Sequence, residues 1–288
     1  MVIAETLSLP SGASMPVLGF GTFRVADATA EDLVCEAISQ GYRLIDTAQG
    51  YGNEAGVGRG LAAVGIARDE LFVTTKVSND HHGREAAYDS VRRSLDDLNT
   101  GYLDLVLIHW PLPHLGLAGE TWDALIRLRD EGSVRDIGLS NFTGVHLKRI
   151  LAQSSVPPAV NQIEWHPYFT QFDAHERHQE LGIVTQSWSS LGRGGLLGDP
   201  ALQDIAAQME VSVARIVLRW HLQRGIAPLV KSSSPQRMRD NLDVFGFELS
   251  SEQMRRIDAL DGRARVGPDP DRYGGPECST HRTHEYTH

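Results

Sequence analysis

The sequence predicts an α/β fold, specifically a (β/α)8 TIM barrel with an N-terminal β-hairpin and a C-terminal loop. Short apolar runs, typical of parallel strands buried on both faces, alternate with amphipathic helical stretches along most of the chain. Their repeat of roughly 25–35 residues fits a strand followed by a helix. Several of the apolar runs end on polar residues, at the positions where such barrels gather their functional groups. An open doubly wound sheet is the alternative that this pattern leaves open.

The elements follow from the chain in order. Residues 6–18 are predicted to form a hairpin around Ser11-Gly12-Ala13, because two short extended pieces flank turn-forming residues. The predicted strands are 18–21, 44–46, 71–76, 103–109, 137–139, 160–163, 183–186 and 229–230, and helices between them include 31–40, 84–97, 122–131, 144–152 and 213–224. From Gly262 onward periodicity is lost, which predicts a loop over the barrel. We expect one domain over 1–278 and a disordered tail over 279–288.

Composition limits the class of protein. Hydrophobic residues make up 41% of the chain and charged residues 22%, as in ordinary soluble globular proteins. The formal net charge of −10 argues against nucleic acid or an anionic membrane as the main partner, since both require basic surface. Cys35 and Cys278 are too few for a disulfide framework. Without a signal-peptide pattern or an apolar stretch of about 20 residues, a cytoplasmic location is predicted.

Four residues carry the strongest functional signal: Asp46, Tyr51, Lys76 and His109 stand at or just beyond the ends of predicted strands. Reduction of a carbonyl leaves an alkoxide that must take a proton, and tyrosine, with an ordinary pKa of about 10, donates poorly at neutral pH. A nearby ammonium lowers that pKa, and a carboxylate keeps the ammonium charged and in place. A neutral imidazole can orient the carbonyl. The set therefore predicts general acid catalysis, although each residue taken alone is more often structural.

Other signals are weaker. Only three of the 27 Lys and Arg residues are Lys, namely Lys76, Lys148 and Lys231, and two of these fall within motifs discussed here. The pairs His81-His82 and His175…His178 lack a third ligand at suitable spacing, so we interpret them as solvated faces and predict no metal site. Gly56 lies in a predicted helix, where packing against a neighbour explains it better than a dinucleotide fingerprint.

The motifs together resemble those of the aldo-keto reductases. The resemblance rests on Gly41-Tyr-Arg-Leu-Ile-Asp-Thr-Ala, Tyr51-Gly-Asn-Glu, Ile108-His-Trp-Pro, Gly138-Leu-Ser-Asn, Asn161-Gln-Ile-Glu and Lys231-Ser-Ser. The stretches 51–58 and 158–164 are similar to the bacterial branch that includes 2,5-diketo-D-gluconate reductases. Membership implies a monomeric (α/β)8 barrel that reduces small carbonyl compounds with NADPH and uses neither a Rossmann fold nor a metal. The tetrad named above would be catalytic, with Tyr51 as general acid.

The resemblance also implies a cofactor site, with Lys231, Ser232, Ser233 and Arg237 holding the 2′-phosphate of NADPH. A Lys, hydroxyls, an Arg and a helix beginning at Ser234-Pro235 make a chemically sensible anion site. Ser140, Asn141 and Gln162 match the positions that bind the nicotinamide carboxamide. Trp188 replaces the Tyr that stacks on the ring in many members. The remaining implied cofactor residues are Gly21, Thr22, Phe23, Asp46, Ser189, Leu191, Gly192, Gly194, Leu196 and Asn241.

The resemblance places the substrate among Phe23, Gln49, Tyr51, His109 and Trp110, in a pocket with aromatic walls. Val77, where diketo-gluconate reductases have Trp, is expected to widen one wall. The sequence leaves open which small carbonyl compound is the substrate. Two other classes also stay open: a cofactor-binding regulatory or redox-sensing subunit with little turnover, and a structural protein that retains only the fold.

Overall fold

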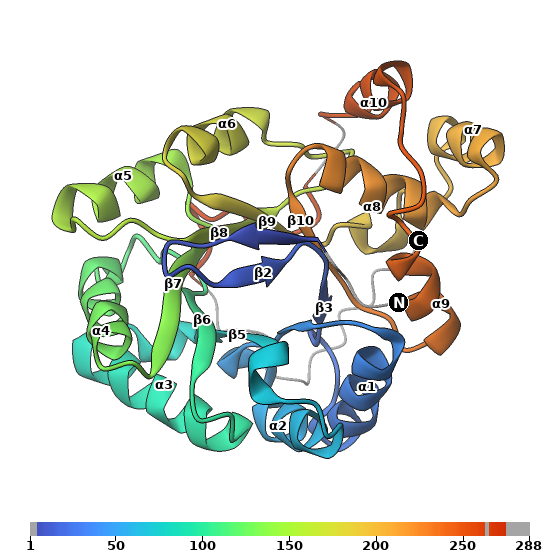
Figure 1. Ribbon diagram of the computed structural model, residues 1–288. Helices are drawn as coiled ribbons and strands as arrows, with labels where there is room; N and C mark the ends of the chain where they lie inside the picture. The colour runs from blue at the N-terminus through green and yellow to red at the C-terminus, as the bar shows by residue number, and fades with distance from the viewer. Residues whose placement is uncertain (1–4, 263–264, 275–288) are drawn as a thin grey trace.

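The computed structural model describes residues 5–262 and 265–274, and its centre is a closed parallel barrel (Figure 1). The strands pair in the order β10-β3-β4-β5-β6-β7-β8-β9, and β10 closes the ring by pairing with β3 through Leu229↔Gly19 and Val230↔Phe20. Closure confirms the predicted barrel and excludes the doubly wound sheet. The barrel strands are β3 (Gly19–Gly21), β4 (Leu44–Asp46), β5 (Phe72–Val77), β6 (Leu103–Ile108), β7 (Val134–Ser140), β8 (Val160–Glu164), β9 (Val184–Trp188) and β10 (Ala227–Val230).

The predicted N-terminal hairpin is also confirmed. Strands β1 (Thr6–Ser8) and β2 (Ser14–Pro16) pair in antiparallel fashion, with Leu7 opposite Met15. Met15 is fully buried against side chains that fill the inside of the barrel, including Leu105 and Leu107. Figure 1 shows the hairpin lying across one end of the barrel. The other end, at the C-terminal ends of the strands, is left for the functional groups.

Helices surround the barrel and bury their apolar faces against the outer faces of the strands (Figure 1). They are α1 (Asp27–Gln40), α2 (Glu54–Ala63), α3 (Arg84–Leu98), α4 (Ala118–Asp130), α5 (Gly144–Gln153), α6 (Phe172–Glu180), α7 (Pro200–Met209), α8 (Val213–Gln223), α9 (Pro235–Leu242) and α10 (Ser251–Asp258), with short 3-10 turns η1 (Gln49–Tyr51), η2 (Arg68–Glu70), η3 (Asn79–His81) and η4 (Gly192–Gly194). The five helices located from the sequence are all present. Helices α1 and α4 begin four residues earlier than predicted, at Asp27 and Ala118.

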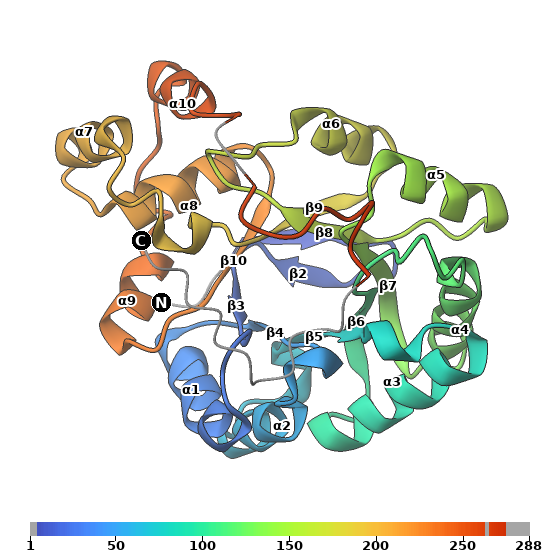
Figure 2. The same cartoon turned by 180° about the vertical axis from the view of Figure 1, so that it is seen from behind.

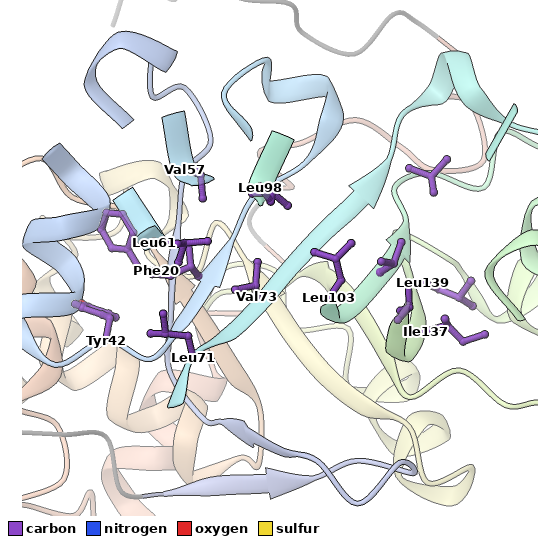
Figure 3. Packing of buried hydrophobic residues seen from close by; sticks show 14 of the residues in the cluster. Phe20, Tyr42, Val57, Leu61, Leu71, Val73, Leu98, Leu103, Ile137 and Leu139 are labelled. Atoms are coloured by element: carbon purple, nitrogen blue, oxygen red, sulfur yellow. The ribbon is translucent and has the colours of Figure 1, made fainter. Parts of the chain in front are cut away.

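Successive side chains along each strand point alternately into two hydrophobic cores, one inside the barrel and one between the strands and the helices. On β6, Leu105 and Leu107 point into the barrel, whereas Val106 and Ile108 belong to the cluster between strands and helices. Figure 3 shows part of this outer cluster, including Val73 of β5 and Leu61 of α2. Gly56 packs as predicted: a Cβ there would lie 2.9 Å from the Ala30 Cβ of α1 and would also strike the Asp27 carbonyl. Glycine therefore allows α1 and α2 to approach closely.

The chain after α10 forms the predicted loop over the C-terminal face of the barrel. The Glu164 carboxylate at the end of β8 accepts hydrogen bonds from the backbone N–H groups of Val266 and Gly267. Farther along, Asp271 accepts from the Thr143 hydroxyl at 3.2 Å. In Figure 2 this segment crosses in front of β8 and β9. Cys278 and the tail predicted for 279–288 lie outside the described residues, and the proposed domain limits stay a prediction.

The prediction that the His175…His178 pair is solvated is wrong. Both side chains are buried between α6 and β9, and each bonds the Thr185 hydroxyl at 2.9 Å. Burial lowers the pKa of His178 to about 4, so this imidazole is neutral near pH 7. His82 is buried as well. Within the described part of the chain, no group of three or more His, Cys, Asp or Glu residues is placed to hold a metal ion.

None of the described helices is both long enough and apolar enough to cross a membrane. The predicted cytoplasmic location and monomeric state stay predictions.

Candidate active site

A buried ion pair forms the centre of the site. Lys76 on β5 points into the barrel, its side chain is fully buried, and its Nζ donates to Asp46 Oδ1 at 2.6 Å and to the Thr47 carbonyl at 2.8 Å. The strand alternation explains this direction, because Thr75 and Val77 on either side face the helices. The same ammonium lies 3.4 Å from the Tyr51 hydroxyl. Three of the four predicted catalytic residues therefore meet, with the phenol as the outermost group.

His109, the fourth predicted residue, follows β6 and lies beside the phenol. Its ring centroid is 5.8 Å from that of Tyr51, in an edge-to-face arrangement. Phe23, which follows the neighbouring strand β3, has its ring centroid 5.2 Å from that of Tyr51. Aromatic rings continue outward through Trp110, which lies 6.4 Å from Trp188 and 4.4 Å from Tyr273 of the C-terminal loop. The Tyr51 phenol therefore sits at the base of an aromatic-walled pocket.

A chain of amide side chains continues from Asp46 across the barrel mouth. Gln162 Nε2 donates to Asp46 Oδ2 at 2.9 Å, which occupies the carboxylate oxygen not bound to Lys76. Asn141 Nδ2 donates to the His109 carbonyl at 3.0 Å, and Asn141 Oδ1 accepts from Trp188 Nε1 at 2.8 Å. Asn141 has a left-handed backbone (φ 64°), a conformation that Asn tolerates better than most residues. The network fixes the orientation of groups that can hydrogen-bond a carboxamide.

A cationic end lies beyond β10. Ser234 caps α9, its hydroxyl accepting from Arg237 N at 3.4 Å, and Pro235 occupies the first turn, as the sequence predicts. Arg237 Nε donates to Ser232 Oγ at 3.3 Å. Lys231 and Arg237 are exposed, and neither forms an ion pair with a described acidic residue. Their charges are thus available to an anion beside a helix N-terminus.

One cavity of about 1060 Å³ joins the two ends. The predicted residues that line it are Gly21, Phe23, Asp46, Tyr51, His109, Trp110, Ser140, Asn141, Gln162, Trp188, Ser189, Leu191, Gly194, Lys231, Ser232, Arg237 and Asn241. Lys76 lies directly beneath its wall. Seven strands contribute residues within two positions of their C-terminal ends, as the barrel topology requires.

Several predicted residues do not line this cavity. Thr22 is buried and donates to the Asp46 carbonyl, Leu196 is buried against Gly192 beneath the loop, and Ser233 is exposed outside the cavity. Val77 is also fully buried in the outer core, so it does not widen the pocket wall as expected.

Gln49 is the most informative of these corrections. Its amide lies outside the cavity and bonds Ser90 and Ser94 of α3 at 3.1 and 3.0 Å. Its oxygen accepts from the Ser78 N–H at 2.9 Å. Gln49 therefore faces the helices, not the pocket mouth where the resemblance places it.

The sequence reasoning missed several lining residues. Arg24 follows the predicted Phe23, and Arg193 lies between the predicted Gly192 and Gly194, so their neighbours were a usable signal. Pro268 and Tyr273 come from the C-terminal loop, whose lack of periodicity gave no indication of which side chains turn inward.

Fold and site together define a barrel enzyme with a buried Asp–Lys pair beneath a partly exposed Tyr at the strand ends. The Aldo/keto reductase family matches residues 17–262, and the chain belongs to that family. An aldo-keto reductase of Mycolicibacterium vanbaalenii is 46% identical over 270 residues, covering 94% of this chain and 97% of the relative. The narrower similarity to diketo-gluconate reductases stays a prediction.

Solved structures agree with this assignment. An aldo/keto reductase from Brucella melitensis matches with a TM-score of 0.86 and 44% identity, covering 89% of this chain and 99% of the other. A point mutant of Gox0644, solved in complex with NADPH, matches with a TM-score of 0.90 and 40% identity, covering 94% and 98% of the two chains.

Proposed function

We propose that this enzyme reduces aldehyde or ketone groups of small carbonyl compounds to alcohols with NADPH, and that Tyr51 is the general acid. The observation that carries the proposal is the contact of the buried Lys76 ammonium with the Tyr51 hydroxyl at 3.4 Å, on the wall of a cavity that also holds His109. A dinucleotide of this kind is bound by the Gox0644 mutant, which shares the fold. The family assignment supports the reaction class.

The residues of the cavity suit NADPH. A volume of about 1060 Å³ lies at the upper end of the range for cofactor sites. Ser140, Asn141 and Gln162 offer amide and hydroxyl groups to a carboxamide at one end. Lys231 and Arg237 offer two cations to a phosphate at the other. We therefore assign the first group to the nicotinamide end and the second to the 2′-phosphate.

NADPH, when bound, supplies the hydride. The chain supplies the proton: the Tyr51 hydroxyl donates to the substrate oxygen as negative charge develops there. The Lys76 ammonium stabilises the phenolate that remains, and Asp46 holds the ammonium in place through the 2.6 Å contact. His109 orients the carbonyl by a hydrogen bond. Acid catalysis of this type contributes ~10²–10⁴-fold to turnover.

The walls of the pocket indicate the substrate class. Phe23, Trp110, Trp188 and Tyr273 present large ring surfaces around the phenol, which favours carbonyl compounds with an apolar or aromatic body. Gln49 lies outside the cavity, so its amide offers no support for a polyhydroxylated substrate.

A carbonyl panel tests the proposal directly. Purified protein is mixed with NADPH and with aromatic aldehydes, aliphatic ketones, methylglyoxal and sugar ketones, while the absorbance of the reduced nicotinamide is followed. We expect turnover, fastest with the aromatic aldehydes. Tight NADPH binding without turnover of any compound would contradict the proposal and favour a regulatory subunit.

A further inference from the structure

We propose that Gln49 is a positioning residue for Tyr51, and that it acts with Glu54 through a largely buried polar brace behind the turn η1. The brace consists of Gln49, Glu54, Thr75, Ser78, Ser90 and Ser94. This inference rests on the proposed function, in which Tyr51 is the proton donor. It gives a role to Gln49 that differs from the substrate contact expected from the sequence.

The Gln49 side chain is saturated with hydrogen bonds. Its Nε2 donates to Ser90 Oγ at 3.1 Å and to Ser94 Oγ at 3.0 Å, which uses both amide protons. Its Oε1 accepts from the Ser78 N–H at 2.9 Å and lies 3.0 Å from His81 Nδ1, which uses both lone pairs. Gln49 thus ties η1 at once to the helix α3 and to the segment that follows β5.

Glu54 extends the brace to the strand that carries the ammonium. It is the first residue of α2, three residues after Tyr51, and only 8% of it is exposed. Its carboxyl accepts from Thr75 Oγ1 at 2.5 Å and from Ser94 Oγ at 3.1 Å. Burial raises the pKa of Glu54 to about 7, while the bonds from Thr75 and Ser94 oppose the shift. Thr75 precedes Lys76, so the brace supports η1 and the Lys76 strand from the helix side.

The contact between the Lys76 ammonium and the Tyr51 hydroxyl is sensitive to such support. Lys76 is fixed by contacts of 2.6 and 2.8 Å, but its contact with the Tyr51 hydroxyl is 3.4 Å, close to the outer limit of a hydrogen bond. A displacement of a few tenths of an ångström would lose it. Gly50 and Gly52 flank Tyr51, and Gly52 has φ +64°, so the backbone around the phenol is intrinsically permissive. A saturated side-chain anchor at Gln49 compensates for that freedom.

The test compares Gln49→Met with Gln223→Met. Methionine keeps the length of glutamine and removes the hydrogen bonds. Gln223 is a matched control: it does not line the cavity, and its amide bonds both backbone groups of Leu249, at 3.0 and 2.7 Å. Both variants should lower the melting temperature. We expect only Gln49→Met to lower kcat, by about ten- to a hundred-fold, because misplacing a reacting group by about 1 Å can cost ~10²-fold.

The pH profile separates positioning from general loosening. Loss of the Lys76 contact should move the Tyr51 ionisation in the kcat profile of Gln49→Met to higher pH, with the KM for NADPH unchanged. If Gln49→Met folds poorly, Ser90→Ala removes one of its partners, and the same shift should appear at smaller amplitude. An unchanged kcat and pH profile in a folded variant would overturn the inference. Absence of turnover in the wild-type enzyme would instead overturn the proposed function.

Discussion

One buried carboxylate lies at each end of the barrel, and the cations that bind the two carboxylates differ in their other contacts. At the base, Asp104 of β6 accepts from Arg68 at 2.7 Å, from Arg135 at 3.2 Å and from the Val73 N–H at 2.9 Å. At the mouth, Asp46 of β4 accepts from Lys76 and Gln162. Asp104 and Asp46 are almost equally buried, at 2% and 3% exposed.

The difference lies in what else the cations contact. The guanidinium groups of Arg68 and Arg135 stack on the Tyr102 ring at 4.0 and 3.9 Å, so their planar faces and their donors serve packing. The Lys76 ammonium instead turns toward the Tyr51 hydroxyl at the cavity wall. A chain with only three lysines places one of them here, where a compact cation is needed. In the proposed mechanism, similar burial therefore serves folding at the base and chemistry at the mouth.

The largest effect should follow from removing the cation at the mouth. Lys76→Met keeps the length and loses the charge, so we expect kcat to fall by at least ~10²-fold and the Tyr51 ionisation to leave the pH profile. Some stability will be lost too, because Asp46 stays buried with only Gln162 to bond it. Lys148→Met, on the exposed face of α5, is the control and should leave kcat and the pH profile unchanged. Near-normal turnover of Lys76→Met would place Lys76 with the structural cations of the base.

A second cation at the mouth should affect binding only. Arg237→Ala removes one charged partner of the 2′-phosphate, and such bonds are worth about 1.5–3 kcal/mol, so NADPH affinity should fall by about ten- to a hundred-fold. NADH lacks that phosphate, so its affinity should change little. Fluorescence titration with both cofactors measures this, with Arg239→Ala on the same helix as control. Equal weakening of both cofactors would mean that Arg237 only supports the turn.

The smallest effect on activity is expected at the base. Asp104→Asn removes the negative charge and replaces one of the two carboxylate oxygens that accept from the arginines by an NH2 donor, which should lower the free energy of unfolding by about 1–3 kcal/mol. Urea unfolding at fixed pH measures this loss. Turnover should stay near the wild-type value, because the base makes no contact with the cavity. A large fall in kcat with unchanged stability would contradict the structural role assigned to Asp104 and the difference drawn between the two ends of the barrel.

The functional residues at the mouth of the barrel could be predicted from the sequence, because parallel strands place their C-terminal residues together. Asp46, Lys76 and His109 needed only correct strand ends, and those were readable as apolar runs. Gln49 and Tyr51 were assigned to one pocket because they share a loop. In a 3-10 turn, with three residues per turn, residues two apart point to different sides, so only Tyr51 reaches the cavity.

Two further errors have the same origin in tertiary packing. His175 and His178 suggested a solvated surface, because nothing in their spacing shows that α6 lays them on β9 beside Trp165. Tyr273 follows a stretch without periodicity, and its approach to Trp110 depends on the bonds that Glu164 makes to the loop. Long-range contacts of this kind leave no local pattern.

Tyr51→Phe tests the central claim most directly. The substitution removes one oxygen and keeps the ring packed against Phe23 and His109. Steady-state kinetics and NADPH titration on the same preparation should show a fall in kcat of at least ~10²-fold with cofactor affinity almost unchanged. Turnover near the wild-type value would contradict the account, because the proton would then come from another group.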